Sequence, residues 1–302
     1  MYIAKQASKL SLPQINPGVS TVLEFLIRKF PSIPPAVWRQ RVNDGKVHLE
    51  DGTTISVSSP FQPQLRVFYY REVIQEPVIP FNERILFEDQ HLMVAYKPHF
   101  LPVTPGGNYV NECLQNRLRM ATENSNLQSL HRIDRVTAGI VLFSKNISSR
   151  HQYHQLFATQ QVDKSYQAIA RINDKAPVIN RTWTVKSRLQ NAASTSPVRA
   201  TMQVVEGVSN SHSRIKCIAK NDGFALFDLK PVTGKTHQLR VHMKYLGWPI
   251  VNDTYYPKVE QERTDDFSKP LQLLAKTIGF TDPITGHRRR FTCPENLNFK
   301  AL

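Results

Sequence analysis

The chain lacks the features of secreted, membrane-spanning and zinc-binding proteins. Its 302 residues contain no apolar run long enough to span a bilayer and no basic amphipathic helix to lie on one. The start, Met1 to Gln6, has no apolar signal-peptide core. Cys113, Cys217 and Cys293 are scattered and have no zinc-like spacing. We therefore expect no membrane association, no bound metal and a reducing, cytoplasmic location.

Acidic residues are scarce relative to basic ones. Lysine and arginine number 39 against 24 aspartates and glutamates, a formal net charge of +15. Such an excess favours a polyanionic partner, because each phosphate that a cation neutralises releases counterions. Nucleic acid is therefore the leading partner before any motif is considered. The length and a hydrophobic content of 40% allow a catalytic domain with a small appendage.

The most informative segment is His131-Arg132-Ile133-Asp134-Arg135-Val136-Thr137-Ala138-Gly139, which precedes the apolar run 140–143. It places the carboxylate of Asp134 between Arg132 and Arg135. Nearby positive charge favours the ionised form of a carboxylate. An ionised, oriented carboxylate on a loop beside a buried strand suits nucleophilic or base catalysis. The alternative is a surface salt bridge at a strand entry.

A second segment is Thr233-Gly234-Lys235-Thr236-His237-Gln238-Leu239-Arg240-Val241-His242. Thr236 is suited to cap a helix that runs to about residue 245. On such a helix His237 and Arg240 lie about one turn apart. A zinc site is disfavoured, because His237 and His242 are five residues apart, not four, and no carboxylate lies between them.

Two further features stand beside these segments. In Lys164-Ser165-Tyr166-Gln167-Ala168, the alternation places Tyr166 and Ala168 on one face of a strand. A lone strand tyrosine is most often an ordinary packing residue, which is the alternative here. Lys97-Pro98 follows a candidate strand at its end, where proline commonly stands.

In this order, the segments resemble the motifs of the RluA-type pseudouridine synthases. The family patterns are Lys-Pro after a strand, His-Arg-Leu-Asp-Arg-x-Thr-Ser-Gly, Lys-x-Tyr-x-Ala and Thr-Gly-Arg-Thr-His-Gln-Ile-Arg-Val-His. The resemblance covers roughly residues 84–294. The main departure is Lys235, which replaces an arginine and keeps the charge but loses the bidentate fork.

The resemblance implies an isomerase that converts uridine in ribosomal or transfer RNA to pseudouridine, without a redox or nucleotide cofactor. The family's catalytic Asp falls on Asp134, its base-contacting Tyr on Tyr166 and its Asp-pairing Arg on Arg240. Arg132 falls where the family fills the space that the flipped base leaves. Contacts with substrate or RNA are expected from Arg132, Arg135, His131, Lys97, Lys164, Lys235, His237, Arg288 and Arg289. The alternative is a catalytically silent RNA-binding or ribosome-assembly factor on the same fold.

The expected fold class is α+β, with a mixed, mainly antiparallel sheet in the catalytic domain. Candidate hairpins follow one another without intervening helices, which disfavours a doubly wound parallel sheet. A helix is expected over 148–157, and strands are expected at 85–89, 92–96, 139–144, 162–170, 182–189, 200–205, 214–220 and 224–230.

The domain division is expected at a proline-containing linker. Residues 1–72 form an N-terminal module, residues 73–83 the linker, and residues 84–302 the catalytic domain of a monomer. Within the module, helices near 22–30 and 37–42 and a strand at 47–49 resemble a small RNA-binding module of ribosomal proteins. The basic residues expected to face phosphates there are Lys29, Arg39, Arg41 and Lys46.

Overall fold

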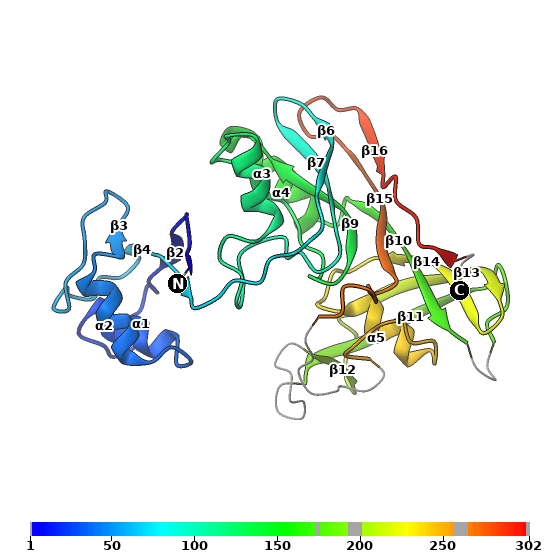
Figure 1. Cartoon of the computed structure of the whole chain (residues 1–302), viewed down its shortest axis with the longest axis horizontal. Helices are drawn as coiled ribbons and strands as arrows, with labels where there is room; N and C mark the ends of the chain where they lie inside the picture. The colour runs from blue at the N-terminus through cyan, green and yellow to red at the C-terminus, as the bar shows by residue number, and fades with distance from the viewer. Residues whose placement is uncertain (1, 173–175, 193–200, 257–264, 300–302) are drawn as a thin grey trace. The chain divides into compact units, whose positions relative to one another are not determined.

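The structure, a computed structural model, describes residues 2–172, 176–192, 201–256 and 265–299 (Figure 1). The chain divides into two compact units. The first comprises Met1–Pro77 with Pro105–Asn111, and the second comprises Val78–Thr104 with Glu112–Leu302. Each unit has a buried hydrophobic core of its own.

The first unit packs two helices, α1 (Val22–Lys29) and α2 (Pro35–Asn43), against a small antiparallel sheet. Helix α1 starts with a capping box, in which the side chains of Thr21 and Glu24 accept each other's backbone N–H groups. The sheet has the order β2–β4–β3, and β1 pairs with β5; the strands are β1 (Tyr2–Ile3), β2 (Ser8–Ser11), β3 (Val47–Leu49), β4 (Arg66–Tyr69) and β5 (Glu72–Val73). The two predicted helices and the predicted strand are present.

The second unit is built on a large, twisted sheet. Its described strands are β6 (Arg84–Glu88), β7 (Leu92–Lys97), β8 (Gln128–Ser129), β9 (Ala138–Ser144), β10 (Asp163–Arg171), β11 (Thr182–Asn191), β12 (Met202–Val205), β13 (Ser211–Asn221), β14 (Phe224–Pro231), β15 (Leu273–Thr281) and β16 (Arg288–Thr292). The main order is β12–β11–β13–β14–β10–β15–β9–β7–β6, with β16 on β15 and β8 on β9. Among the described strands, only β9 and β15 pair in parallel. The predicted α+β class with a mixed, mainly antiparallel sheet is confirmed.

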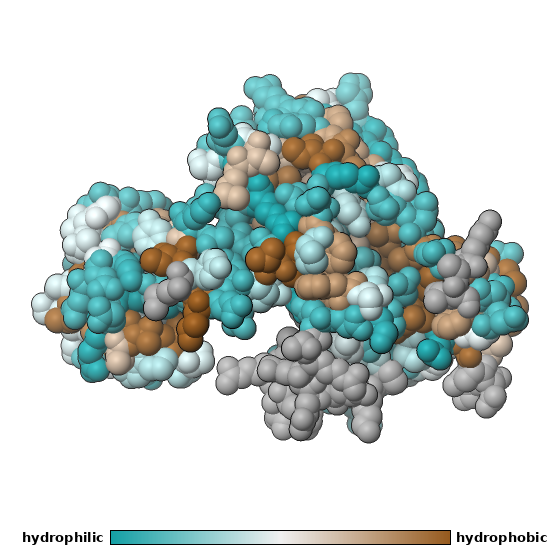
Figure 2. All heavy atoms as spheres, viewed as in Figure 1, coloured by the Kyte–Doolittle hydropathy of each residue, from teal (hydrophilic) through white to brown (hydrophobic). Residues whose placement is uncertain are grey.

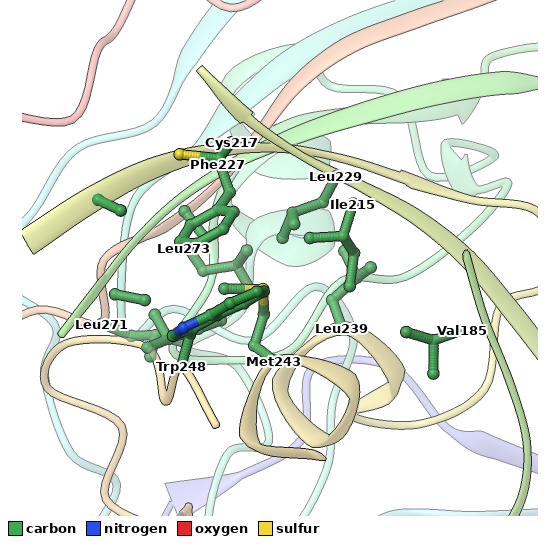
Figure 3. Close-up of a cluster of buried hydrophobic side chains, with 14 residues drawn as sticks. Val185, Ile215, Cys217, Phe227, Leu229, Leu239, Met243, Trp248, Leu271 and Leu273 are labelled. Atoms are coloured by element: carbon green, nitrogen blue, oxygen red, sulfur yellow. The ribbon is translucent and has the colours of Figure 1, made fainter. Parts of the chain in front are cut away.

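In the described part of this unit, three helices accompany the sheet: α3 (Leu114–Ala121), α4 (Ile147–Ala158) and α5 (Gln238–Tyr245). Met243 of α5 and the following Trp248 pack against Phe227 and Leu273 on the strands (Figure 3). A second core joins Tyr153 of α4 to the other half of the sheet. Burial of these apolar side chains fixes α5 against the strands and so positions its first turn.

The start of α5 differs from the prediction. Thr236 does not cap the helix; the N-cap is His237, whose backbone is left-handed with φ 51° and whose side chain makes no capping hydrogen bond. Because the His237 ring does not cap the helix, it is available to contact Tyr256 and Asp134. The predicted strand start at Ala200 lies outside the described residues, and β12 begins at Met202.

The surroundings of Gly139 explain why the segment 131–139 ends in glycine. Its φ is +126°, and a Cβ atom there would lie 2.4–2.7 Å from backbone atoms of Ala275. Ala138 and Gly139 form the short parallel pairing with Leu274 and Ala275. Only glycine allows this approach, which places the loop before β9 beside the centre of the sheet.

No helix in the described part of the chain is long and apolar enough to cross a bilayer. The face of the molecule in Figure 2 carries mostly hydrophilic residues, with hydrophobic ones in small groups. Residues 74–83 form no helix or strand.

Candidate active site

A cavity of about 770 Å³ lies in the second unit, between the segment 131–137 that precedes β9 and the segment 231–240 that leads into α5. Strand β10 contributes side chains between them. Nine of the twelve predicted site residues line this cavity: His131, Arg132, Asp134, Arg135, Lys164, Tyr166, Lys235, His237 and Arg240. The other three, Lys97, Arg288 and Arg289, do not.

The loop that carries Asp134 is held by its backbone. The N–H of Thr137 donates to the carbonyl of Asp134 at 3.0 Å, which closes a turn. The ammonium of Lys97 donates to the carbonyl of Arg135 at 2.9 Å, and the Nδ1–H of His99 donates to that of Val136 at 2.8 Å. Hydrogen bonds to two successive carbonyls restrain the loop, so the carboxylate is pre-positioned.

The predicted partner of Asp134 is in place. Nη1 of Arg240 lies 3.5 Å from Oδ2 of Asp134, and the Arg240 side chain is only 1% exposed, against 26% for Asp134. The stronger partner of Arg240 is Asp253, which binds Nε at 2.8 Å and Nη2 at 2.7 Å. The rings of Tyr255 and Tyr256 lie 5.0 and 5.3 Å from the guanidinium carbon, within cation–π range.

These contacts keep Arg240 charged inside the protein. Burial alone lowers the pKa of Arg240, but hydrogen bonds and the charge of Asp253 outweigh it, and Asp134 adds to the effect. The net pKa is therefore raised above its usual value. One cation thus bridges a buried carboxylate and the carboxylate that faces the cavity.

His237 forms a second contact with the same carboxylate. Its Nε2 lies 4.0 Å from Oδ1 of Asp134, and its Nδ1 lies 3.1 Å from the hydroxyl of Tyr256. That hydroxyl accepts the N–H of Met202 and has its own hydrogen to donate to Nδ1, and the carboxylate of Asp134 on the other side favours the tautomer with the proton on Nε2. Burial lowers the pKa of His237. A neutral ring therefore presents an N–H group to the cavity.

Tyr166 stands on β10 and lines the same cavity as the Asp134 loop. Its ring is partly buried and packs against the core around Phe227. Burial raises the pKa of Tyr166 well above its usual value, and the charge of Asp134 raises it further. The phenol is therefore protonated at neutral pH, and the ring offers an apolar wall to a planar ligand.

Four predicted contacts need correction or narrowing. The ammonium of Lys97 is fully buried and donates to the carbonyls of Pro98, Leu101 and Arg135, so no donor remains for RNA. Arg289 binds Asp89 at 2.6 Å and Asp282 at 2.7 Å and is likewise occupied. Both side chains support the fold, because polar groups that are removed from water need hydrogen-bond partners.

His131 is also not a cationic contact. Its ring stacks on Phe157 at 4.9 Å, and its Nε2 accepts the N–H of Leu142 at 3.1 Å. Burial lowers the pKa of His131 to about 3, with a contribution from Lys164, so the ring is neutral. Arg135 lines the cavity but also forms a bidentate pair with Asp265 at 2.5 and 2.8 Å.

Asp253 is the main site residue that the sequence analysis missed. It stands in Pro249-Ile250-Val251-Asn252-Asp253, which resembles the family's Pro-Ile-x-Gly-Asp, and that resemblance was the available signal. Tyr255 and Tyr256 follow it two and three residues later, so one short segment supplies the buried carboxylate and both rings around Arg240.

Comparisons with known proteins show the family of this chain. A family model described as RNA pseudouridylate synthase matches residues 91–245, about half of the chain. The chain belongs to the RNA pseudouridylate synthase family. The ribosomal large subunit pseudouridine synthase C of Salmonella typhimurium is 30% identical over 84% of this chain and 80% of its own length. The mitochondrial tRNA pseudouridine(32) synthase of Saccharomyces cerevisiae is 26% identical over 79% of this chain and 51% of its own length.

The fold agrees as well. The structure of human RNA pseudouridylate synthase domain containing 1 superimposes with a TM-score of 0.57 at 22% identity, covering 73% of this chain and 86% of that one. The resemblance to the RluA type is thereby confirmed, and the protein is an RNA-acting isomerase. The alternative of a catalytically silent RNA-binding factor is not favoured.

Proposed function

We propose that this pseudouridine synthase isomerises uridine in ribosomal or transfer RNA, with Asp134 as the catalytic carboxylate. One observation carries the proposal: Asp134, Tyr166 and Arg240 come from three separate segments and line one cavity. A cavity of about 770 Å³ falls within the size range of small-ligand sites, which suits a single flipped nucleotide.

The reaction exchanges one glycosidic bond for another. The bond from ribose C1′ to uracil N1 breaks, the base turns, and a bond from C1′ to C5 forms; the C5 proton leaves and N1 gains one. Atoms balance without a redox partner. Asp134 acts as a nucleophile on the sugar or as a base, and both routes require an ionised carboxylate at the cavity wall.

The neighbouring groups support that carboxylate. Arg240, held by Asp253, provides a fixed positive charge beside it, and the Nε2–H of His237 provides a neutral donor. Tyr166 packs against the base, and the exposed Arg132 fills the space that the base leaves in the RNA stack.

Pseudouridine mapping tests this assignment. Total RNA from cells with and without the gene is treated with carbodiimide, and reverse-transcription stops are compared. A stop that disappears in the deletion strain should return with the wild-type gene and with Asp222→Asn, the same chemical change at an exposed turn. Asp134→Asn should not restore it. Restoration by Asp134→Asn would remove Asp134 from the mechanism.

We also propose that the first unit assists RNA binding. Lys29 and Arg39 are exposed on α1 and α2, whereas Arg41 is buried over Trp38 and Lys46 is paired with Asp44 and Glu72. Of the four basic residues predicted to face phosphates in this unit, Lys29 and Arg39 therefore remain candidates. Double substitution of these two by alanine should weaken binding of the mapped RNA. The monomeric state and the cytoplasmic location stay predictions.

A further inference from the structure

A second groove adjoins the active-site cavity. Its volume is about 640 Å³, and it shares five lining residues with the cavity: Gln160, Val162, Lys164, Pro231 and Val232. The two hollows therefore have a common rim. An RNA strand whose target nucleotide enters the cavity has this groove as a continuous path for the nucleotides beside it.

The groove is strongly basic. Its lining includes five cationic side chains and one carboxylate, Asp163, which pairs with Arg288. The cations stand on strands of the β13–β14–β10–β15–β16 part of the sheet: Lys164, Arg214, Lys230, Arg288 and Arg290. At about 4.8 Å per strand spacing, this row is about 19 Å wide. It is wide enough for more than one phosphate.

Two of these cations face each other across neighbouring strands, which destabilises the sheet. Arg214 on β13 lies directly opposite Lys230 on β14 in the antiparallel register. Like charges in directly opposed positions destabilise a sheet. Both residues are exposed, and among the described residues Lys230 forms one long ion pair, at 3.6 Å with Asp228. A bound polyanion would relieve this repulsion.

The groove also differs from the cavity in what it lacks. None of its lining residues, all within the described chain, is aromatic. The cavity, by contrast, is lined by Tyr166, Phe157 and two histidines. Unstacked bases are recognised by stacking on such rings, whereas phosphates are recognised by lysine and arginine. The groove is therefore suited to the RNA backbone and not to a second flipped base.

We infer that this groove, with Arg214, Lys230 and Arg290 as its main contacts, binds the phosphates of the RNA strand that flanks the target uridine. The inference rests on the proposed function, because it takes RNA as the substrate. It adds a direction: from the cavity, the strand runs over β14 and β10 toward β16 (Figure 1).

Binding measurements over a range of salt concentrations test the inference. The full chain with Asp134→Asn, which blocks turnover, is titrated with an oligouridylate long enough to reach both hollows and with the transcript that mapping identifies. Lys230→Ala and Arg290→Ala should each weaken binding roughly three- to tenfold and lower the salt slope by about 0.7. Lys220→Ala is the matched control, because Lys220 is exposed on neighbouring β13 but does not line the groove.

A stability measurement separates binding from folding. Arg214→Thr should weaken RNA binding without lowering the melting temperature, because it removes a like-charge pair. The inference is overturned if Lys220→Ala weakens binding as much as Lys230→Ala, or if the groove variants leave the salt slope unchanged. Failure of the proposed function would appear separately, as a wild-type protein that modifies no uridine, while the oligouridylate result still decides the groove.

Discussion

Arg240 and Asp253 form a buried bidentate ion pair behind the active-site cavity. Their side chains are 1% and 0% exposed, and two nitrogens of Arg240 bind the carboxylate at 2.8 and 2.7 Å. Asp253 also accepts the backbone N–H groups of Tyr255 and Tyr256. The pair fixes the guanidinium plane, so the third nitrogen is directed to Asp134.

Substitution of Asp253 should therefore affect folding and activity together. Asp253→Asn leaves a buried cation without its main counter-charge, which we expect to lower the free energy of unfolding by about 3 kcal/mol. A displaced Arg240 should reduce the rate of pseudouridine formation about 100-fold. Urea denaturation and single-turnover assays measure the two effects.

The matched variant is Asp134→Asn. Its side chain is 26% exposed and lies farther from Arg240, at 3.5 Å, so its removal should change stability by less than about 1 kcal/mol while activity is lost. Equal loss of stability in the two variants would contradict the conclusion that Arg240 binds Asp253 more strongly than it binds Asp134.

Gly139 offers a test of how the loop is placed. Gly139→Ala brings a Cβ atom within 2.7 Å of the backbone of Ala275 at φ +126°, so we expect a loss of about 3 kcal/mol in the free energy of unfolding. Gly247→Ala, at φ +86° with no atom within 4 Å, should lose only about 1 kcal/mol. Thermal unfolding of both variants checks the difference. Similar losses of stability in the two variants would mean that the close approach of β9 and β15 is not what requires glycine at position 139.

Much of the fold followed from local sequence patterns. Hairpin spacing without intervening helices predicted the mixed, mainly antiparallel sheet, because neighbouring antiparallel strands need only short turns. The convergence of Asp134, Tyr166 and Arg240 was implied by the family resemblance, since sequence alone shows no contact between residues such as Asp134 and Arg240, which are 106 positions apart. The parallel β9–β15 pairing was not predicted, because its signal is a single glycine.

Which basic side chains contact RNA and which pair within the fold was harder to predict. Lys97 and Arg289 look like RNA contacts in a chain of net charge +15, yet each is occupied by partners that the fold brings together. Arg289 meets Asp89 and Asp282 from distant segments. Sequence shows where a basic residue stands in the chain, but not whether a distant carboxylate pairs with it or distant carbonyls accept its hydrogen bonds.

Tyr166 should act through its ring. Burial keeps the phenol protonated, so its contribution to a planar base is packing. Tyr166→Phe should keep the rate of pseudouridine formation within about tenfold, whereas Tyr166→Leu, which loses the planar wall, should reduce it about 100-fold or more. Single-turnover rates with the mapped RNA decide between them. A Tyr166→Phe enzyme as slow as Tyr166→Leu would show that the hydroxyl takes part.

Three partly or fully buried histidines, His99, His131 and His242, should make the protein acid-sensitive. Burial lowers the pKa of His131 to about 3 and the pKa values of His99 and His242 to about 4. Unfolding returns each ring to a pKa of about 6.5, so the unfolded state binds more protons below that pH. The neutral rings therefore contribute full stability above about pH 6.5, and this contribution is lost as the pH falls toward the folded pKa values.

The expected loss is about 2 kcal/mol for each histidine between about pH 8 and about pH 5. Urea denaturation at the two pH values measures it. His131→Gln keeps an acceptor for the N–H of Leu142 but does not titrate, so it should be less stable at about pH 8 and lose one histidine's share of the pH dependence. If His131→Gln lost as much free energy of unfolding between about pH 8 and about pH 5 as the wild type, the His131 ring would not contribute to the acid sensitivity.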